Sequence, residues 1–154
     1  MAARTVVGTI SSATLAISAG LPATYDAAGY GATTIVYTTI GEIENFGNHG
    51  VTATITEFTP VATAVVAKTK GSKNYGTMSL TLGSIPTNAG QVILLAASES
   101  NAHYSVKLTY PDGEIHYIDA LVAKHEYQDG AVNDVMKVGV DLAICRAPVI
   151  VAAV

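Results

Sequence analysis

Histidines are the residues of this 154-residue chain that are best suited to metal binding or proton transfer. Sites built on histidine often place two rings at a fixed spacing, such as His-x-His or His-Glu-x-x-His, so that two ring nitrogens meet one ion. The four histidines show neither spacing, and we interpret them as surface or interface residues that hold no metal and no cofactor. They are His49, His103, His116 and His125.

Gly71-Ser72-Lys73 and Cys145 are the remaining short features that could suggest chemistry. A phosphate-binding loop needs a glycine five residues before its Gly-Lys pair and a helix after it, whereas the sequence around Gly71 favours a hairpin turn between two strands. Cys145 is the only cysteine, and we expect it to be a small buried hydrophobe in a protein that folds in a reducing compartment. No nucleophile with a base stands out, so the sequence predicts no enzyme.

The composition bounds the class of protein. Hydrophobic residues make up 49% of the chain and charged residues 13%, against about 25% charged in an ordinary soluble domain, which excludes a disordered chain. The longest apolar runs, 92–97 and 149–154, are far shorter than the roughly 18 residues of a membrane span, and polar residues interrupt the stretch after Arg4, so we expect neither membrane insertion nor a signal peptide. A net charge of −4 argues against a groove that grips nucleic acid.

The elements that must position these residues are mostly strands. Thr, Val and Ile, the residue types that fit a pleated and half-buried surface, account for nearly a third of the chain. Alternation over 104–110 predicts a strand with one buried face, and the turn at Pro111-Asp112-Gly113 predicts a hairpin with a second strand over 115–124. Gln128-Asp129-Gly130 repeats the turn signal, so we expect a third strand and an antiparallel meander. Its buried face should carry Val132, Met136, Val138, Val140, Leu142 and Ile144.

The N-terminal half is less regular, and it contains one expected helix. Thr87 or Asn88 can cap free N–H groups, and Gln91 follows Asn88 by three residues as in a capping box, which predicts a helix over about 87–98. A single helix on a β-rich body indicates a mainly β (α+β) fold, a β-sandwich or barrel-like domain with one flanking helix. The strands expected in this half are 33–43, 51–58, 61–68 and 75–82.

Charge is distributed unevenly along the chain. Lys68, Lys70 and Lys73 place three of the eight basic residues within six positions. They form either a solvated hairpin tip or a charged contact that meets acids on a neighbouring subunit, where such charges fix register and choose the partner. Glu42 and Glu44 would share one face if their segment is extended, because strand side chains alternate. Glu57 is a further candidate acid.

The low charged fraction also bears on assembly. A monomer with several strands, an apolar C-terminal stretch and so few charges risks pairing edge to edge with other copies. Closing the sheets of several copies into one barrel removes those edges. We therefore expect a chain that is completed by oligomerisation.

Several segments together resemble tail tube proteins of long-tailed, non-contractile bacteriophages. They are 19–30 (AGLPATYDAAGY), 40–47 (IGEIENFG), 70–76 (KGSKNYG) and the strand pair around Pro111-Asp112-Gly113. The resemblance runs from about residue 19 to 144, and its specificity lies in the order and spacing of the segments. It implies a tail tube domain over 19–145, with 1–18 as an N-terminal arm or an extra strand and 146–154 as a C-terminal tail.

The resemblance also implies a structural subunit without an active site, which assembles into hexameric rings that stack into a tube. Segments 43–50, 67–76 and the termini are expected to become ordered on stacking. Candidate inter-subunit contacts are Lys68, Lys70, Lys73, Asn74 and Tyr75. The lumen must pass double-stranded DNA without holding it, so its wall should be negative or neutral. Candidate lumen charges are Glu42, Glu44, Glu57, Asp119 and Asp141.

The expected partners are other copies of the chain, a tape measure protein, a tail terminator, tail-tip proteins and the phage DNA in transit. The expected location is the tail of the virion, and the host cytoplasm during assembly. Alternatives are a tube or connector protein of a secretion machine, a head-tail junction protein and a capsid decoration protein. A small-ligand-binding β-barrel or an enzyme is the remaining alternative, and it would need a polar pocket with convergent titratable groups.

Overall fold

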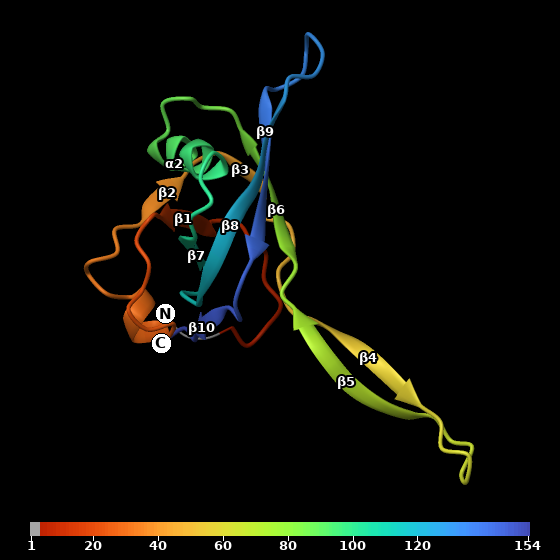
Figure 1. The fold of residues 1–154 in the computed structure, drawn as a ribbon. Coiled ribbons are helices and arrows are strands. Elements are labelled where there is room, and N and C mark those ends of the chain that lie inside the picture. The colour runs from red at the N-terminus through yellow and green to blue at the C-terminus, as the bar shows by residue number, and fades with distance from the viewer. Residues whose placement is uncertain (1–3) are drawn as a thin grey trace.

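The computed structural model describes residues 4–154, which form a body and a protruding two-stranded arm (Figure 1). The fold is mostly β, as predicted. The strands are β1 (Thr14–Ser18), β2 (Thr38–Ile40), β3 (Ile43–Asn45), β4 (Thr52–Phe58), β5 (Ala67–Asn74), β6 (Thr77–Gly83), β7 (Tyr104–Thr109), β8 (Ile115–Gln128), β9 (Lys137–Ile144) and β10 (Val149–Val151). The helices are α1 (Ala27–Tyr30) and α2 (Ala89–Ser98).

The body is built from one curled antiparallel sheet. Its strand order is β2-β1-β7-β8-β9-β6-β3, and β10 pairs with β8 beside this path. β2 and β3 stand at opposite ends of the order, yet only Gly41 and Glu42 separate them in sequence. The sheet therefore curls until its two edges approach each other, which gives the barrel-like form expected from the sequence.

The core lies inside this curl, and α2 covers it on one side (Figure 1). Alternate residues of β6 and β9 point inward, so each strand contributes one apolar face and leaves the other face polar. The buried cluster comprises Leu15, Ile17, Ile40, Met78, Leu80, Leu82, Leu94, Ala97, Tyr104, Val106, Leu108, Ile118, Ala120, Val122, Val138, Val140, Leu142 and Ile144.

Helix α2 confirms the predicted helix. The Asn88 side chain accepts a hydrogen bond from the N–H of Gln91 at 3.1 Å, as a capping residue should. The Gln91 amide does not return to Asn88 as in a capping box. It donates to the carbonyls of Gly41 and Gly83 at 3.2 and 2.8 Å, so it ties the helix to the corner where the sheet edges meet. Gly90 lets α2 pack closely on β2, because a Cβ there would overlap the Thr39 carbonyl.

The C-terminal meander is confirmed as β7, β8 and β9. β8 runs to Gln128, four residues beyond the expected end, and the loop 129–136 projects past the body at the end opposite the arm (Figure 1). The expected placement of Val132 and Met136 on the buried face is wrong, because both lie exposed in this loop. The loop closes on itself instead, since the Asp134 carboxylate accepts from the N–H of Ala131 at 2.8 Å.

Other expectations for individual segments are corrected. Most of 33–43 is irregular, with only β2 and the first residue of β3 as strand, and 61–66 is the loop at the tip of the arm. Gly71 lies within β5, so the hairpin-turn interpretation of Gly71-Ser72-Lys73 is also wrong. Helix α1 was not expected; its first turn is capped by the Asp26 carboxylate, which accepts from Gly29 N–H at 2.7 Å. Cys145 is exposed because β9 ends at the residue before it.

The two terminal segments take part in the sheet. β1 lies between β2 and β7, so the end of segment 1–18 forms an interior strand that contributes Leu15 and Ile17 to the core. In the segment 146–154, β10 pairs with the start of β8.

Candidate assembly surfaces

The arm formed by β4 and β5 stands away from the body along its whole length (Figure 1). The two strands pair only with each other, and every residue of β5 is exposed. A lone two-stranded ribbon is marginally stable in water. The arm is therefore a surface that lacks a partner within the described chain.

A β-bulge places the three lysines on one face of the arm. Each lysine pairs with one of three alternate residues of β4, which share one face. The pairs are Lys68 with Glu57, Lys70 with Ile55, and Lys73 with Ala53. The extra residue in β5 between Lys70 and Lys73 restores the alternation that a spacing of three would otherwise break. Within this face, Lys68 forms an exposed ion pair with Glu57 at 3.1 Å.

The tip of the arm is apolar. Phe58 is 69% exposed, and Val61 is fully exposed in the loop that joins the two strands. Val65 and Val66 continue this surface on the returning side of the loop. Large apolar side chains gathered at the end of an unsupported ribbon are typical of a protein contact surface.

Charge separates the arm from the body. Residues 52–74 contain three lysines and one glutamate, which gives the arm a charge of +2. The whole chain carries −4, so the remaining residues carry −6. Opposite potentials of this kind favour association between a basic and an acidic protein surface.

The last two predicted contact residues lie where the arm joins the body. Asn74 ends β5, and its side-chain oxygen accepts from the N–H of Gly76 at 2.8 Å in a tight turn. Gly76 has a φ of +71°, a conformation that glycine adopts without strain. Tyr75, between them, is half-buried and packs against the core. The structure thus places Lys68, Lys70 and Lys73 on the arm, and Asn74 and Tyr75 at its base.

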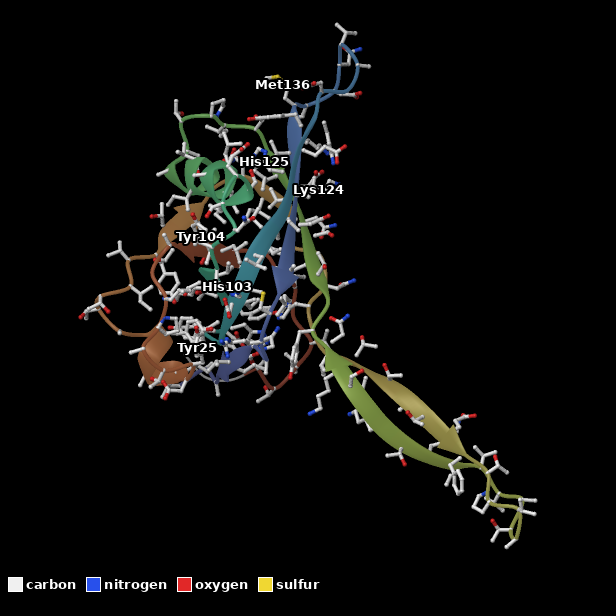
Figure 2. The ribbon with its side chains drawn as sticks, viewed as in Figure 1. Tyr25, His103, Tyr104, Lys124, His125 and Met136 are labelled. Atoms are coloured by element: carbon white, nitrogen blue, oxygen red, sulfur yellow. The ribbon has the colours of Figure 1, made fainter. Side chains whose placement is uncertain are left out.

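A second surface is the outer face of the sheet, on the side away from α2. Figure 2 shows Lys124 on this side and His125 on the side of α2. The Lys124 ammonium contacts Glu126 at 2.8 Å, and this hydrogen bond, with a smaller contribution from Asp141, raises the pKa of Lys124. Lys137 contacts Glu44 at 2.7 Å across the same face. Apart from Asp141 and Glu44, these charges were not predicted. The facing of Lys124 and Glu126 depends on a bulge in β8 after Val122.

The structure corrects the expected shared face of Glu42 and Glu44, and it corrects Asp119 as a candidate lumen charge. Glu42 has a φ of +57° at the corner between β2 and β3, so the segment is not extended there and Glu42 does not continue the alternation of Glu44. Asp119 is only 2% exposed and presents no free charge to any surface. Glu44 and Asp141 lie on the outer sheet face, and Glu57 lies on the arm.

Asp119 instead joins segments that are distant in sequence. Its two carboxylate oxygens contact His103 at 2.9 Å and Arg146 at 3.0 Å, and the Arg146 guanidinium stacks on Tyr25 at 3.9 Å (Tyr25 and His103 are labelled in Figure 2). Tyr30 packs beneath Tyr25, and burial raises the pKa of Tyr30 to about 12. This cluster connects β8 to the segment before β7 and to the start of the C-terminal segment.

Within residues 4–154, no group of three or more His, Cys, Asp or Glu side chains could hold a metal ion. None of the helices described there has the length and apolar character needed to cross a membrane. The prominent features without a partner in the described residues are the two surfaces, the arm and the outer face of the sheet.

A family model of the phage tail tube protein, TTP, matches residues 3–153. The chain belongs to the phage tail tube protein family. The resemblance of the separate segments is thereby confirmed over nearly the whole length, and it extends to both ends beyond the range 19–144. As a tail tube protein, the chain is a structural component of the virion tail.

Solved structures of tube assemblies share this fold. A chain in the sheath/tube terminator of an extracellular contractile injection system, PVC, has a TM-score of 0.67 at 10% identity, with 96% of this chain and 98% of that chain covered. A chain of the virion of a native gene transfer agent particle has 0.62 at 13% identity, with 75% and 89% covered. The SPP1 tail tube has 0.60 at 13% identity, with 91% and 76% covered. A search of curated protein sequences finds no match.

Proposed function

We propose that this tail tube protein forms hexameric rings that stack into a hollow, non-contractile tail tube, through which double-stranded DNA passes into the host. The observation that carries the proposal is the arm, which extends from the body without an intramolecular partner. A contact between two different surfaces of identical chains makes rings where it closes and filaments where it does not. A stacked tube needs one contact of each kind.

The arm supplies the contact between rings. Its lysine-bearing face and apolar tip dock on the acidic body of a copy in the next ring, and the exposed apolar residues of the tip become buried there. Lys68, Lys70, Lys73, Asn74 and Tyr75 are the proposed contact residues. Docking would also order the arm, because each strand of the ribbon gains contacts that it lacks in the isolated chain.

The outer face of β8, β9, β6 and β3 supplies the wall of the lumen. Its acids Glu44, Glu126 and Asp141 outnumber its lysines Lys124 and Lys137, and four of these five groups lie in two ion pairs. Such a wall offers DNA phosphates no excess of positive charge, so no counterions are released and the DNA is not held. Asp119 has no part in this wall.

The remaining partners are proposed because the chain belongs to the tail tube protein family. A tube of fixed length needs proteins that start, measure and end it, and we assign these places to tail-tip proteins, a tape measure protein and a tail terminator. The similarity to a tube terminator chain supports a second candidate, a tube or terminator subunit of a contractile injection system. The two candidates differ in whether a contractile sheath surrounds the tube.

Electron microscopy of the purified, concentrated chain tests the proposal. We expect sixfold rings or tubes, and a three-dimensional reconstruction should place Glu44 and Asp141 on the bore. A chain that remains monomeric at high concentration would contradict self-assembly. A bore lined by another face would contradict the proposed wall.

A variant of the tip tests the role of the arm. Replacing Phe58, Val61 and Val65 with serine removes apolar surface that is exposed in the single chain, so folding should be unchanged and tubes should be lost. The matched control replaces Leu21 and Val36 with serine, two exposed apolar residues of the body. An equal loss of tubes in both variants would show that the arm has no special part in stacking.

A further inference from the structure

His49 and His116 form a direct hydrogen bond at the base of the arm. His49 lies in the segment 46–51, which connects β3 to β4, and His116 lies near the start of β8. The distance from His49 Nε2 to His116 Nδ1 is 2.8 Å, and the two rings meet edge to face at 5.1 Å between centroids. His49 is thus a direct tie between the connection into the arm and the body.

The partners of His116 determine which nitrogens carry hydrogen. His116 Nε2 contacts a Glu114 carboxylate oxygen at 2.7 Å, and an ionised carboxylate can only accept. Nε2 of His116 therefore donates to Glu114. In a neutral His116 ring, Nδ1 is then an acceptor, and His49 Nε2 donates to it.

This arrangement has room for one added proton but not for two. After a first protonation, His116 donates from Nδ1 to an unprotonated Nε2 of His49, and the hydrogen bond survives with its direction reversed. After a second protonation, both nitrogens carry hydrogen at a separation of 2.8 Å, and two like charges face each other. Double protonation therefore breaks the contact.

The charged groups around the pair make the second proton unfavourable. Glu114 compensates one positive charge, but the Arg4 guanidinium lies 3.8 Å from Glu114 and 2.8 Å from Asp112, so part of that negative charge is already matched. Tyr110 packs its ring against His116. Lys73 of the arm and Tyr75 of its base line the same groove as the two histidines, and this groove has a volume of about 390 Å³.

We propose that the His49–His116 hydrogen bond is a pH-sensitive latch, which holds the base of the arm on the body at neutral pH and releases it when both rings are protonated. Burial, with a further effect of His116, lowers the pKa of His49 below its ordinary value of about 6.5. The released ring therefore binds protons more readily than the latched ring. The latch is fully favoured above pH 6.5 and weakens as the pH falls below that value.

The consequence for assembly rests on the proposed function: a released arm is a poorer stacking element, so tubes should lose stability in acid. The latch itself is a property of the single chain. It can be measured on chains that have not assembled.

NMR relaxation of the full chain at pH 7.5 and pH 5.0 tests the latch. We expect the order parameter S² of residues 48–51 to fall from about 0.85 to below about 0.6 on acidification, while β6 and β9 stay rigid. His49→Gln keeps a donor for His116 but cannot be protonated, and it should keep the segment ordered at both pH values. His103→Gln, which alters a histidine paired with Asp119 outside this pair, should retain the acid-induced loss of order.

Several outcomes would overturn the latch. One is an unchanged S² in the natural chain, and another is the same loss of order in His49→Gln. Titration of the ring protons in the unaltered chain gives a check that needs no variant: mobility must follow the second ring protonation, and mobility that follows the first contradicts the proposal. Sedimentation at pH 7.5 keeps the two proposals apart, because absence of tubes there counts against the proposed function and leaves the latch measurement unaffected.

Discussion

The arm and the body are both built from antiparallel strands, but the strands of the body enclose a core and those of the arm do not. β4 and β6 are both seven residues long, and threonine or serine recurs at alternate positions in each. β6 buries Met78, Leu80 and Leu82 on one face, whereas β4 has no apolar face, because Ile55 lies between Ala53 and Glu57. A strand enters a core when one of its faces is continuously apolar, and β-propensity alone does not decide this.

This difference separates stability from assembly. The body holds the buried apolar surface and the cluster around Asp119, so the free energy of unfolding should depend on it. The arm holds exposed apolar and basic groups, and the proposed function places their main contacts in other copies of the chain. Substitutions in the two regions should therefore affect different measurements.

The largest contrast is expected between Leu80→Ala and Ile55→Ala. Leu80 is buried in β6, so its truncation leaves a cavity and should lower the free energy of unfolding by about 3–5 kcal/mol. Ile55 is exposed on the arm, and its truncation should change that free energy by no more than about 0.5 kcal/mol. Urea unfolding followed by circular dichroism measures both values. Similar losses would mean that the arm folds cooperatively with the body and would remove the distinction.

A smaller loss is expected from Asp119→Asn within the body. The substitution keeps the size of the side chain but removes the charge that pairs with Arg146 and with His103 when that ring is protonated. Arg146 is 52% exposed and can be solvated, so the loss should be about 1–3 kcal/mol, below that of a core cavity. Urea unfolding at neutral pH measures the change. A stability equal to that of the natural chain would show that the cluster is merely tolerated.

Local signals in the sequence were sufficient for some elements of the body. Asn88 and Gln91 marked the start of α2, and the turns at Gly113 and Gly130 separated the strands of the meander. Each of these signals acts over a few residues. The arm could not be recognised from residue types, because glycine at 71 and proline at 60 are common in turns. In the structure Gly71 lies inside a strand that, within the described residues, pairs with β4 and with no strand of the body.

The candidate functional residues likewise divide into those that local sequence signals could place and those that they could not. The cluster Lys68, Lys70 and Lys73 could be found by spacing, but its common face depends on a bulge that no short motif announces. Asp119 was misplaced because an acidic residue in a strand is usually exposed. Its burial follows from Arg146 and His103, partners 27 and 16 positions away. Contacts between distant segments decided each case.

The smallest effect on stability is expected from reversing Lys70 and Lys73 to glutamate. Both side chains are exposed on the arm, so the free energy of unfolding should change by no more than about 0.5 kcal/mol. The arm would change from +2 to −2 and would meet an acidic body with like charge, so tube yield in sedimentation should fall sharply at low salt. The control, Lys124→Glu with Lys137→Glu, makes the same change in total charge on the sheet face and should retain tubes. An undiminished yield for the arm variant would mean that its lysines are an ordinary solvated surface.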